Sequence, residues 1–200
     1  MQDTEATLLA NARHGDPQAF SALVELYQTP VYNLCYRMLN NTGDAEDAAQ
    51  ETFLRAYKSM KKYDTSRSFA TWLMSIAAHY CIDQMRKRRM TIVSTEDLPY
   101  FEVVDGNPGP ESRVAQRQEQ DSVRKLLYTL NPVDRAAVVM YYWNELSYQE
   151  ISQALDLTES AVKSRLHRAR RSLAQTRIDQ QRKIQQHERN HHGELQSPAF

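Results

Sequence analysis

The chain has 200 residues, of which 41% are hydrophobic, enough to bury one sizeable core or two small ones. Its 25 lysines and arginines balance 25 aspartates and glutamates, which excludes a uniformly basic nucleic-acid-binding protein, so any basic surface must be local. The longest apolar run, Ala136 to Trp143, is far shorter than the ~20 residues that cross a bilayer, and the first residues lack a signal-peptide pattern. We therefore expect no membrane insertion. From the length and composition we expect two small helical domains.

Cys35 and Cys81 are the two cysteines, and both fall within predicted helices without the spacing of metal ligands. We expect reduced, buried thiols and no disulfide. This cysteine usage favours a cytoplasmic protein.

Three helices are predicted in the first 60 residues. Residues 4–13 have a helical pattern that ends at Gly15, and Asp16 should cap the next helix, with Pro17 in its first turn. The apolar stripe of this second helix runs to about Met38 and is typical of a core: Phe20, Leu23, Val24, Tyr27, Val31, Leu34 and Cys35.

A turn at residues 40–43 leads to the third helix, which we expect Asp44 to cap. Its inward face is predicted to carry Ala45, Ala48, Thr52, Tyr57 and Met60, bordered by Phe53. Its outward face is polar and is either an ordinary solvated surface or a binding site for a partner: Asp47, Gln50, Glu51, Arg55 and Lys58.

A polar loop over residues 61–68 precedes a long helix from Phe69 that begins apolar and ends basic. Its predicted core residues are Trp72, Leu73, Ile76 and Ala77, and its basic end is formed by Arg86, Lys87, Arg88 and Arg89.

We expect residues 91–112 to form a linker, because prolines and glycines between Pro99 and Pro110 interrupt any regular element. The stretch from Met90 to Ser112 has no lysine or arginine but five acids: Glu96, Asp97, Glu102, Asp105 and Glu111. The charge is therefore unevenly distributed, and segments of opposite sign can serve different partners.

The chain is predicted to be helical again from Arg113, with apolar residues from Val123 to Leu130. Asn131 and Pro132 should begin the next helix, whose core residues are Ala136, Val139, Met140 and Trp143.

Residues 145–172 predict a helix-turn-helix. Ser147 and Glu150 form a capping box, flanked by Leu146 and Ile151 as a hydrophobic staple, so a helix should start after Ser147. Asp156 and Leu157 then break the pattern, and Thr158 can cap a second helix that buries Val162, Leu166, Ala169 and Leu173.

The outward face of this second helix carries long cations and small hydroxyls, which reach phosphates and base edges when a helix enters the major groove. A merely solvated basic face is the alternative. The candidate DNA-binding residues are Ser160, Lys163, Ser164, His167, Arg168 and Arg171.

Residues 176–200 form a polar extension that we expect to be partly disordered. His187, His191 and His192 have helical spacing but lack a matching carboxylate or cysteine cluster, so we predict no metal site.

Three motifs in this order identify a family resemblance: AEDAAQETFLRAY, RSFATWLMSIAAHYCIDQMRK and LSYQEISQALDLTESAVKSRLHRAR. The last motif alone is shared by many regulators, but together they resemble the extracytoplasmic-function group of bacterial sigma factors, over about Ala19 to Ser172. The resemblance implies a transcription-initiation subunit that binds core RNA polymerase, recognises two promoter elements and helps to melt the minus-ten element. It implies neither enzymatic activity nor a cofactor.

The resemblance also divides the chain into residues 1–90, which bind polymerase and the minus-ten element, the linker 91–112, and residues 113–175, which bind the minus-thirty-five element. The linker would thread the polymerase active-site cleft. The third helix would dock on the clamp coiled coil of the beta-prime subunit through Asp47, Gln50, Glu51 and Arg55. An anti-sigma protein that covers such surfaces is a further expected partner.

The minus-ten element would be read by the loop and long helix between residues 63 and 87, where unstacked bases need stacking surfaces and hydrogen-bond partners. The candidates are Tyr63, Asp64, Ser66, Arg67, His79, Asp83, Arg86 and Lys87, whereas Trp72 is assigned to the core. His79 departs from the family, in which an asparagine is common at this position.

Two rival classes are an operator-binding regulator with a sensory or dimerising first domain and a metal-dependent enzyme. The polar face of the third helix and the acidic linker argue against the first. The second lacks a histidine and carboxylate constellation and a phosphate-binding glycine loop.

Overall fold

The computed structural model describes residues 4–94 and 123–194, in which every regular element is a helix, as the predicted all-α fold requires. Beyond residue 178 the side chains, except that of Arg182, are not described. The elements are α1 Glu5–Arg13, α2 Pro17–Leu39, α3 Thr42–Ser59, the 3-10 helix η1 Met60–Lys62, α4 Phe69–Ser94, a helical segment over residues 123–128, α6 Pro132–Tyr142, α7 Tyr148–Ala154 and α8 Glu159–Glu194.

The first half of the fold is a bundle in which α2, α3 and α4 contact one another and α1 packs on α2. Ala45, Ala48, Ala77 and Ala78 are fully buried, and such small side chains allow α3 and α4 to lie close together. Asp16 caps α2 as predicted, accepting a hydrogen bond from Gln18 N at 2.8 Å.

Cys35 on α2 and Cys81 on α4 are free, buried thiols, as predicted. The hydrogen bond between the Cys81 and Cys35 thiols and burial both raise the pKa of the Cys81 thiol. Because the thiolate is the reactive form, these residues act as small core side chains.

Two predictions for α3 are wrong. Asn41, not Asp44, caps the helix, because Asn41 Oδ1 accepts from Asp44 N at 2.9 Å, so the helix begins earlier than predicted. Tyr57 is 47% exposed, and Ala56 is the buried residue of that turn. The buried positions keep helical spacing down to Ala56, and Tyr57 lies about 100° around the helix from that position.

The second half confirms the predicted helix-turn-helix. Asn131 caps α6, Ser147 caps α7 in a capping box, and Thr158 Oγ1 accepts from Ala161 N at 3.2 Å at the start of α8. Asp156 has a left-handed φ of 53° in the turn between α7 and α8. The core between these helices includes Val139, Ile151, Val162, Leu166 and Ala169.

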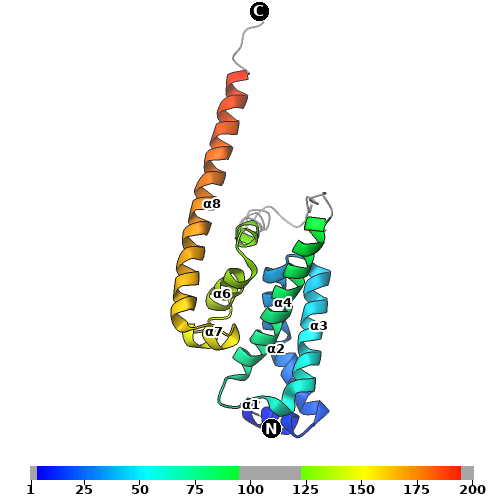
Figure 1. The fold of residues 1–200 in the computed structure, drawn as a ribbon. Coiled ribbons are helices and arrows are strands. Elements are labelled where there is room, and N and C mark those ends of the chain that lie inside the picture. Colours follow the sequence, from blue (N-terminus) through cyan, green and yellow to red (C-terminus); the bar gives the residue numbers. More distant parts are fainter. Residues whose placement is uncertain (1–3, 95–122, 195–200) are drawn as a thin grey trace, which may run out of the picture.

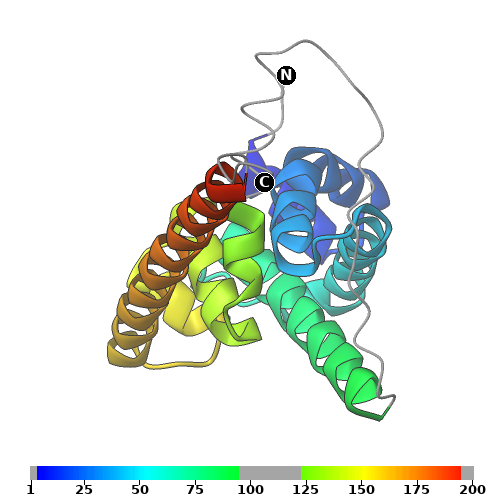
Figure 2. The same ribbon diagram turned by 90° about the horizontal axis from the view of Figure 1, so that it is seen from above.

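The two halves pack against each other along a seam in which α4 contacts α6 and α7, and α2 contacts α6. Seen from above, α6 lies between α8 and the first half (Figure 2). The C-terminal part of α8 extends well beyond the other helices, at the opposite end of the molecule from α1 (Figure 1). Within residues 4–94 and 123–194, no helix has an apolar stretch long enough to span a bilayer.

Candidate nucleic-acid and partner interfaces

The capping box fixes the start of the helix-turn-helix. Ser147 N donates to Glu150 Oε2 at 2.9 Å, and Glu150 N donates to Ser147 Oγ at 3.2 Å, so two otherwise unpaired amide groups are satisfied. The hydrogen bonds that Ser147 N and Ser147 Oγ donate to this carboxylate hold the pKa of Glu150 below its ordinary value. The cap therefore depends on an ionised Glu150.

The outward face of α8 is exposed. Its six candidate residues are exposed: Ser160, Lys163, Ser164, His167, Arg168 and Arg171. Lys163 Nζ lies 5.7 Å from the ring centroid of Tyr148, a cation–π contact that orients Lys163 at the start of the helix. The face can therefore lie against a polyanion without rearrangement of the second half.

Arg165 lies on the other side of α8, where it holds the helix to α6. Its Nη1 is 2.7 Å from Asp134 Oδ1, and the two side chains are only 29% and 11% exposed. Asp134 in turn accepts from Asn131 Nδ2 at 2.6 Å. The arginines of α8 thus divide between a structural ion pair and an exposed basic face.

The loop before α4 is a preformed turn around Asp64. Asp64 accepts hydrogen bonds from Ser66 N at 2.9 Å and Ser66 Oγ at 2.8 Å, and these bonds lower the pKa of Asp64. Asp64, Ser66 and Arg67 are exposed. The loop therefore presents polar groups of fixed geometry.

Tyr63, by contrast, is only 4% exposed. Its hydroxyl donates to Arg67 O at 2.5 Å, and its ring contacts Phe69 and Trp72, with centroids 5.6 and 4.9 Å away. Tyr63 therefore supports the loop from its buried side. Its ring has no exposed face on which a base could stack.

The remaining minus-ten candidates lie along α4. His79, Asp83, Arg86 and Lys87 are exposed at helical spacing. His79 Nδ1 donates to Ser75 O at 2.8 Å, which leaves Nε2 as the outward nitrogen. Arg86 and Asp83 form a weak, exposed ion pair of 3.9 Å.

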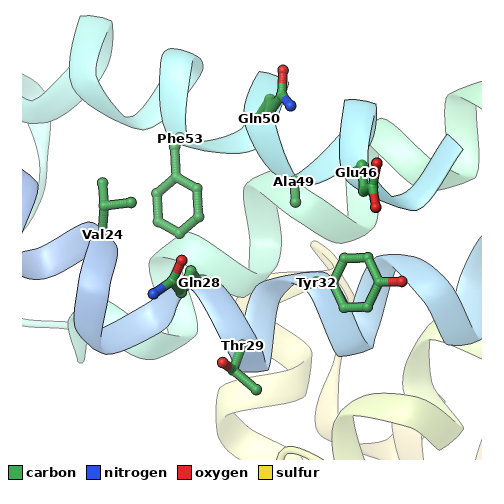
Figure 3. Close-up of a pocket in the computed structure, with 8 residues that line it drawn as sticks. All are labelled: Val24, Gln28, Thr29, Tyr32, Glu46, Ala49, Gln50 and Phe53. Atoms are coloured by element: carbon green, nitrogen blue, oxygen red, sulfur yellow. The ribbon is translucent and has the colours of Figure 1, made fainter. Parts of the chain in front are cut away.

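The polar face of α3 adjoins a surface groove of about 380 Å³ between α2 and α3. Figure 3 shows Phe53 directed toward α2 beside Val24, and the ring of Tyr32 near Glu46. Gln50, one of the predicted polymerase contacts, lines the groove, and Asp47 is exposed next to Glu46.

Glu51 and Arg55 complete this face through an ion pair with an Oε1 to Nε distance of 2.7 Å. Arg55 also lies over the ring of Tyr80 at 4.9 Å, so its position is fixed by α4. The sequence analysis missed Leu54, which is 47% exposed beside Phe53. The sequence did contain a signal for Leu54. It is a leucine on the polar face of the helix, out of phase with the buried positions.

No group of three or more histidine, cysteine or acidic side chains in the described part of the chain is arranged to hold a metal ion. The side chains of His187, His191 and His192 lie outside that part, as does most of the predicted linker.

The chain matches two family models in the order that the motifs predict. Residues 23–91 match Sigma-70 region 2, and residues 120–173 match Sigma-70 region 4. The ECF RNA polymerase sigma factor SigW of Bacillus subtilis is 36% identical over 172 residues, which cover 82% of this chain and 92% of SigW. The chain belongs to the ECF RNA polymerase sigma factors. As an alternative sigma factor it directs RNA polymerase to initiate transcription at promoters. The alternative interpretation, an independent operator-binding regulator, is not favoured.

A second relative agrees with this membership, and a solved structure has a similar fold. The ECF RNA polymerase sigma factor SigE of Mycolicibacterium smegmatis is 35% identical over 157 residues, which are 78% of this chain and 60% of SigE. The fold is similar to that of CnrH in complex with the cytosolic domain of CnrY, with a TM-score of 0.67 and 24% identity over 88% of this chain and 99% of that one. Sigma factors are non-catalytic transcription initiation factors.

Proposed function

We propose that this sigma factor binds core RNA polymerase through α3, reads the minus-ten element with α4 and its preceding loop, and reads the minus-thirty-five element with α8. Its place of action is then the cytoplasm, where promoters and polymerase meet. The observation that carries the proposal is the separation of roles on α8: Arg165 is tied to Asp134, while the six candidate DNA-binding residues face solvent.

At the minus-thirty-five element, we assign base contacts to the first turns of α8. Ser160, Lys163 and Ser164 lie there, and the N-terminal residues of a recognition helix are those that meet base edges. Arg168 and Arg171 lie one to two turns further along and suit phosphate contacts, which position the protein on the duplex.

At the minus-ten element, we assign hydrogen-bond recognition of unpaired bases to Asp64, Ser66, Arg67 and His79. The preformed Asp64 turn supports this assignment, because its geometry requires no ordering when DNA binds. Asp83, Arg86 and Lys87 follow on the same helix as contacts to bases or backbone. We assign Tyr63, which is buried, as a positioning residue that holds the loop in place.

At the polymerase, we assign binding to the α3 face together with the groove beside it. Asp47, Gln50, Glu51 and Arg55 supply a polar rim, and Phe53 and Leu54 supply apolar area. A helical surface with basic residues would match this face in shape and charge, and we assign that role to the clamp coiled coil of the beta-prime subunit.

A regulatory partner is part of the proposal. RpoE of Bartonella quintana, whose fold is similar to this one with a TM-score of 0.63 at 23% identity over 78% of this chain and 94% of that one, was solved in complex with the anti-sigma factor NepR. We propose an anti-sigma factor for this chain as well. A pull-down from uninduced native cells that returned only polymerase subunits would count against it.

The test of the proposed function is transcription of fragmented genomic DNA from the native cell by purified core polymerase, with and without the chain. Mapped transcript starts should appear only with both components and should share two upstream sequence elements. An operator-binding regulator would bind DNA fragments without polymerase and create no new starts.

A further inference from the structure

Tyr148 connects the recognition helix with a helix outside the helix-turn-helix. It is the first residue of α7, directly after the Ser147 cap, and its half-buried ring packs against the core of the second half. Lys163 Nζ on α8 lies 5.7 Å from the centroid of this ring. The position of the Lys163 ammonium group therefore depends on a residue that does not belong to α8.

Tyr148 is itself held in place by α6. The ring of Tyr141 stacks on it, with centroids 5.2 Å apart and an angle of 19° between the two planes. The two hydroxyl groups also form a hydrogen bond, which raises the pKa of Tyr141. Because the capping box fixes the main chain at the start of α7, both the backbone and the ring of Tyr148 have little freedom. Tyr148 is thus a rigid platform for a cation.

Lys163 has no competing charged partner in the described part of the chain. Glu159 lies one turn earlier on α8, at a spacing that allows an ion pair, but the ion pair of α8 described there is formed by Arg165 and not by Lys163. A lysine has a flexible four-carbon stem, so without a contact its ammonium group would sample many positions in front of a DNA groove. The Tyr148 ring restricts these positions.

The contact with the ring leaves Lys163 able to read a base. An ammonium group has three N–H donors, and those directed away from the ring can reach the O6 and N7 acceptors of a guanine. The attraction between the cation and the ring also becomes stronger when DNA excludes water from the site. The ring therefore favours one position of the ammonium group over a shift to a neighbouring phosphate.

We infer that Tyr148 is a positioning residue that sets base preference at the minus-thirty-five element, because it holds the Lys163 ammonium group at one base pair. The inference rests on the proposed base contact of Lys163. Tyr148 needs no contact with a base for this role. Part of the specificity of the recognition helix then comes from α6 and α7.

The test measures base preference, because overall affinity for DNA would also respond to a loss of structure. The complex of core polymerase with the full-length chain is bound to promoters that carry each single-base change in the minus-thirty-five element. Tyr148→Leu should reduce preference by about two- to fivefold at the one position that Lys163→Ala relaxes. Tyr148→Phe, which keeps the ring, should retain the preference. In the Lys163→Ala background, Tyr148→Leu should have no further effect on it.

The matched control is Tyr142→Leu. Tyr142 is 48% exposed in the same aromatic cluster, and its ring contacts are with Tyr141 and Trp143. This variant should keep every base preference. An unchanged preference in Tyr148→Leu, or an equal loss in Tyr148→Phe, would overturn the inference while leaving the base contact of Lys163 intact. If Lys163→Ala alone changed no preference, the proposed base contact would fail and the inference with it.

A second measurement does not depend on the folding of the leucine variant. Pentafluorophenylalanine in place of Tyr148 keeps the shape and stacking of a phenylalanine ring but removes the negative potential of its face, which attracts the cation. The preference at the position read by Lys163 should fall to the level of Tyr148→Leu. Equal preferences of the fluorinated chain and Tyr148→Phe would contradict a role for the ring face.

Discussion

Glu150 Oε1 accepts a hydrogen bond from Thr71 Oγ1 at 3.1 Å, while Oε2 of the same carboxylate caps α7 through Ser147. One ionised side chain therefore supports the local start of the helix-turn-helix and its contact with α4. Protonation of Glu150 should weaken both.

This relationship predicts a specific acid sensitivity. The pKa of Glu150 lies below its ordinary value of 4.5 because Ser147 donates to the carboxylate, so the folded chain binds this proton more weakly than the unfolded chain. Glu150 therefore stabilises the fold above pH 4.5, and the contribution is lost as the pH falls through the lowered pKa.

The matched variant is Glu150→Gln, which keeps the length of the cap but cannot ionise. Thermal unfolding midpoints of both proteins should be compared between neutral and acidic pH. The unfolding midpoint of the wild type should exceed that of Glu150→Gln at neutral pH, and this difference should become smaller at low pH. A difference between the two proteins that stays constant with pH would rule out this role for the carboxylate.

The second prediction concerns the recognition helix. Lys163→Ala should relax preference at one position of the minus-thirty-five element and cost about 1–3 kcal/mol on the preferred sequence, if Lys163 touches a base. Arg168→Ala should weaken binding to all sequences alike and reduce its salt dependence, as expected for a phosphate contact.

Binding to a set of single-base promoter variants at several salt concentrations separates the two effects. Arg177→Ala is the control, because Arg177 is exposed on α8 but lies beyond the region that matches the family. If neither Lys163→Ala nor Arg168→Ala differs from this control, the assignment of the α8 face fails.

The third prediction concerns polymerase. Asp47→Lys and Glu51→Lys should each weaken binding of core polymerase by about tenfold, because each reverses a charge on the face that we assign to polymerase binding. Asp47 is exposed, so the thermal stability and the minus-thirty-five binding of the Asp47→Lys chain should not change. Glu51→Lys replaces the ion pair with Arg55 by a like-charge pair, so it should also lose about 0.2–0.5 kcal/mol of stability. Unaltered affinity of both variants for core enzyme would make this an ordinary solvated face.

The fourth prediction uses the histidine that departs from the family. His79→Asn should shift base preference within the minus-ten element without changing affinity for core polymerase. An asparagine presents its donor and acceptor in one plane, whereas the Nδ1 of His79 is bonded to Ser75 O and only Nε2 remains outward.

The control is Asp156→Asn, which removes the charged partner of His79 across the seam but leaves the imidazole in place. This variant should keep the original base preference. Identical activities of wild type and His79→Asn on every single-base variant of the minus-ten element would defeat the prediction.

The elements whose signals are local were predictable from the sequence. The capping box at Ser147, the proline-led start of α2 and the buried stripe of α8 each depend on residues within one or two turns, and all three are confirmed. The cap of α3 was placed three residues late because Asn41 and Asp44 are both good capping residues, and only backbone geometry separates them.

The seam was not predictable by the same means. Arg135 looks like an ordinary surface arginine near the start of a helix, and its buried guanidinium donates to the carbonyl of Met38, 97 residues earlier in the chain. The burial of Tyr63 likewise depends on Phe69 and Trp72 closing around its ring. Such contacts follow from how the helices pack, which a pattern along one helix does not encode.

The most direct test of the central claim is the reactivity of unpaired thymines toward permanganate at the minus-ten element of a promoter mapped with this chain. Core polymerase with the chain should make these thymines reactive, whereas polymerase alone and the chain alone should leave them protected. Thymines that stay protected in the presence of both components would contradict a role for this sigma factor in promoter opening.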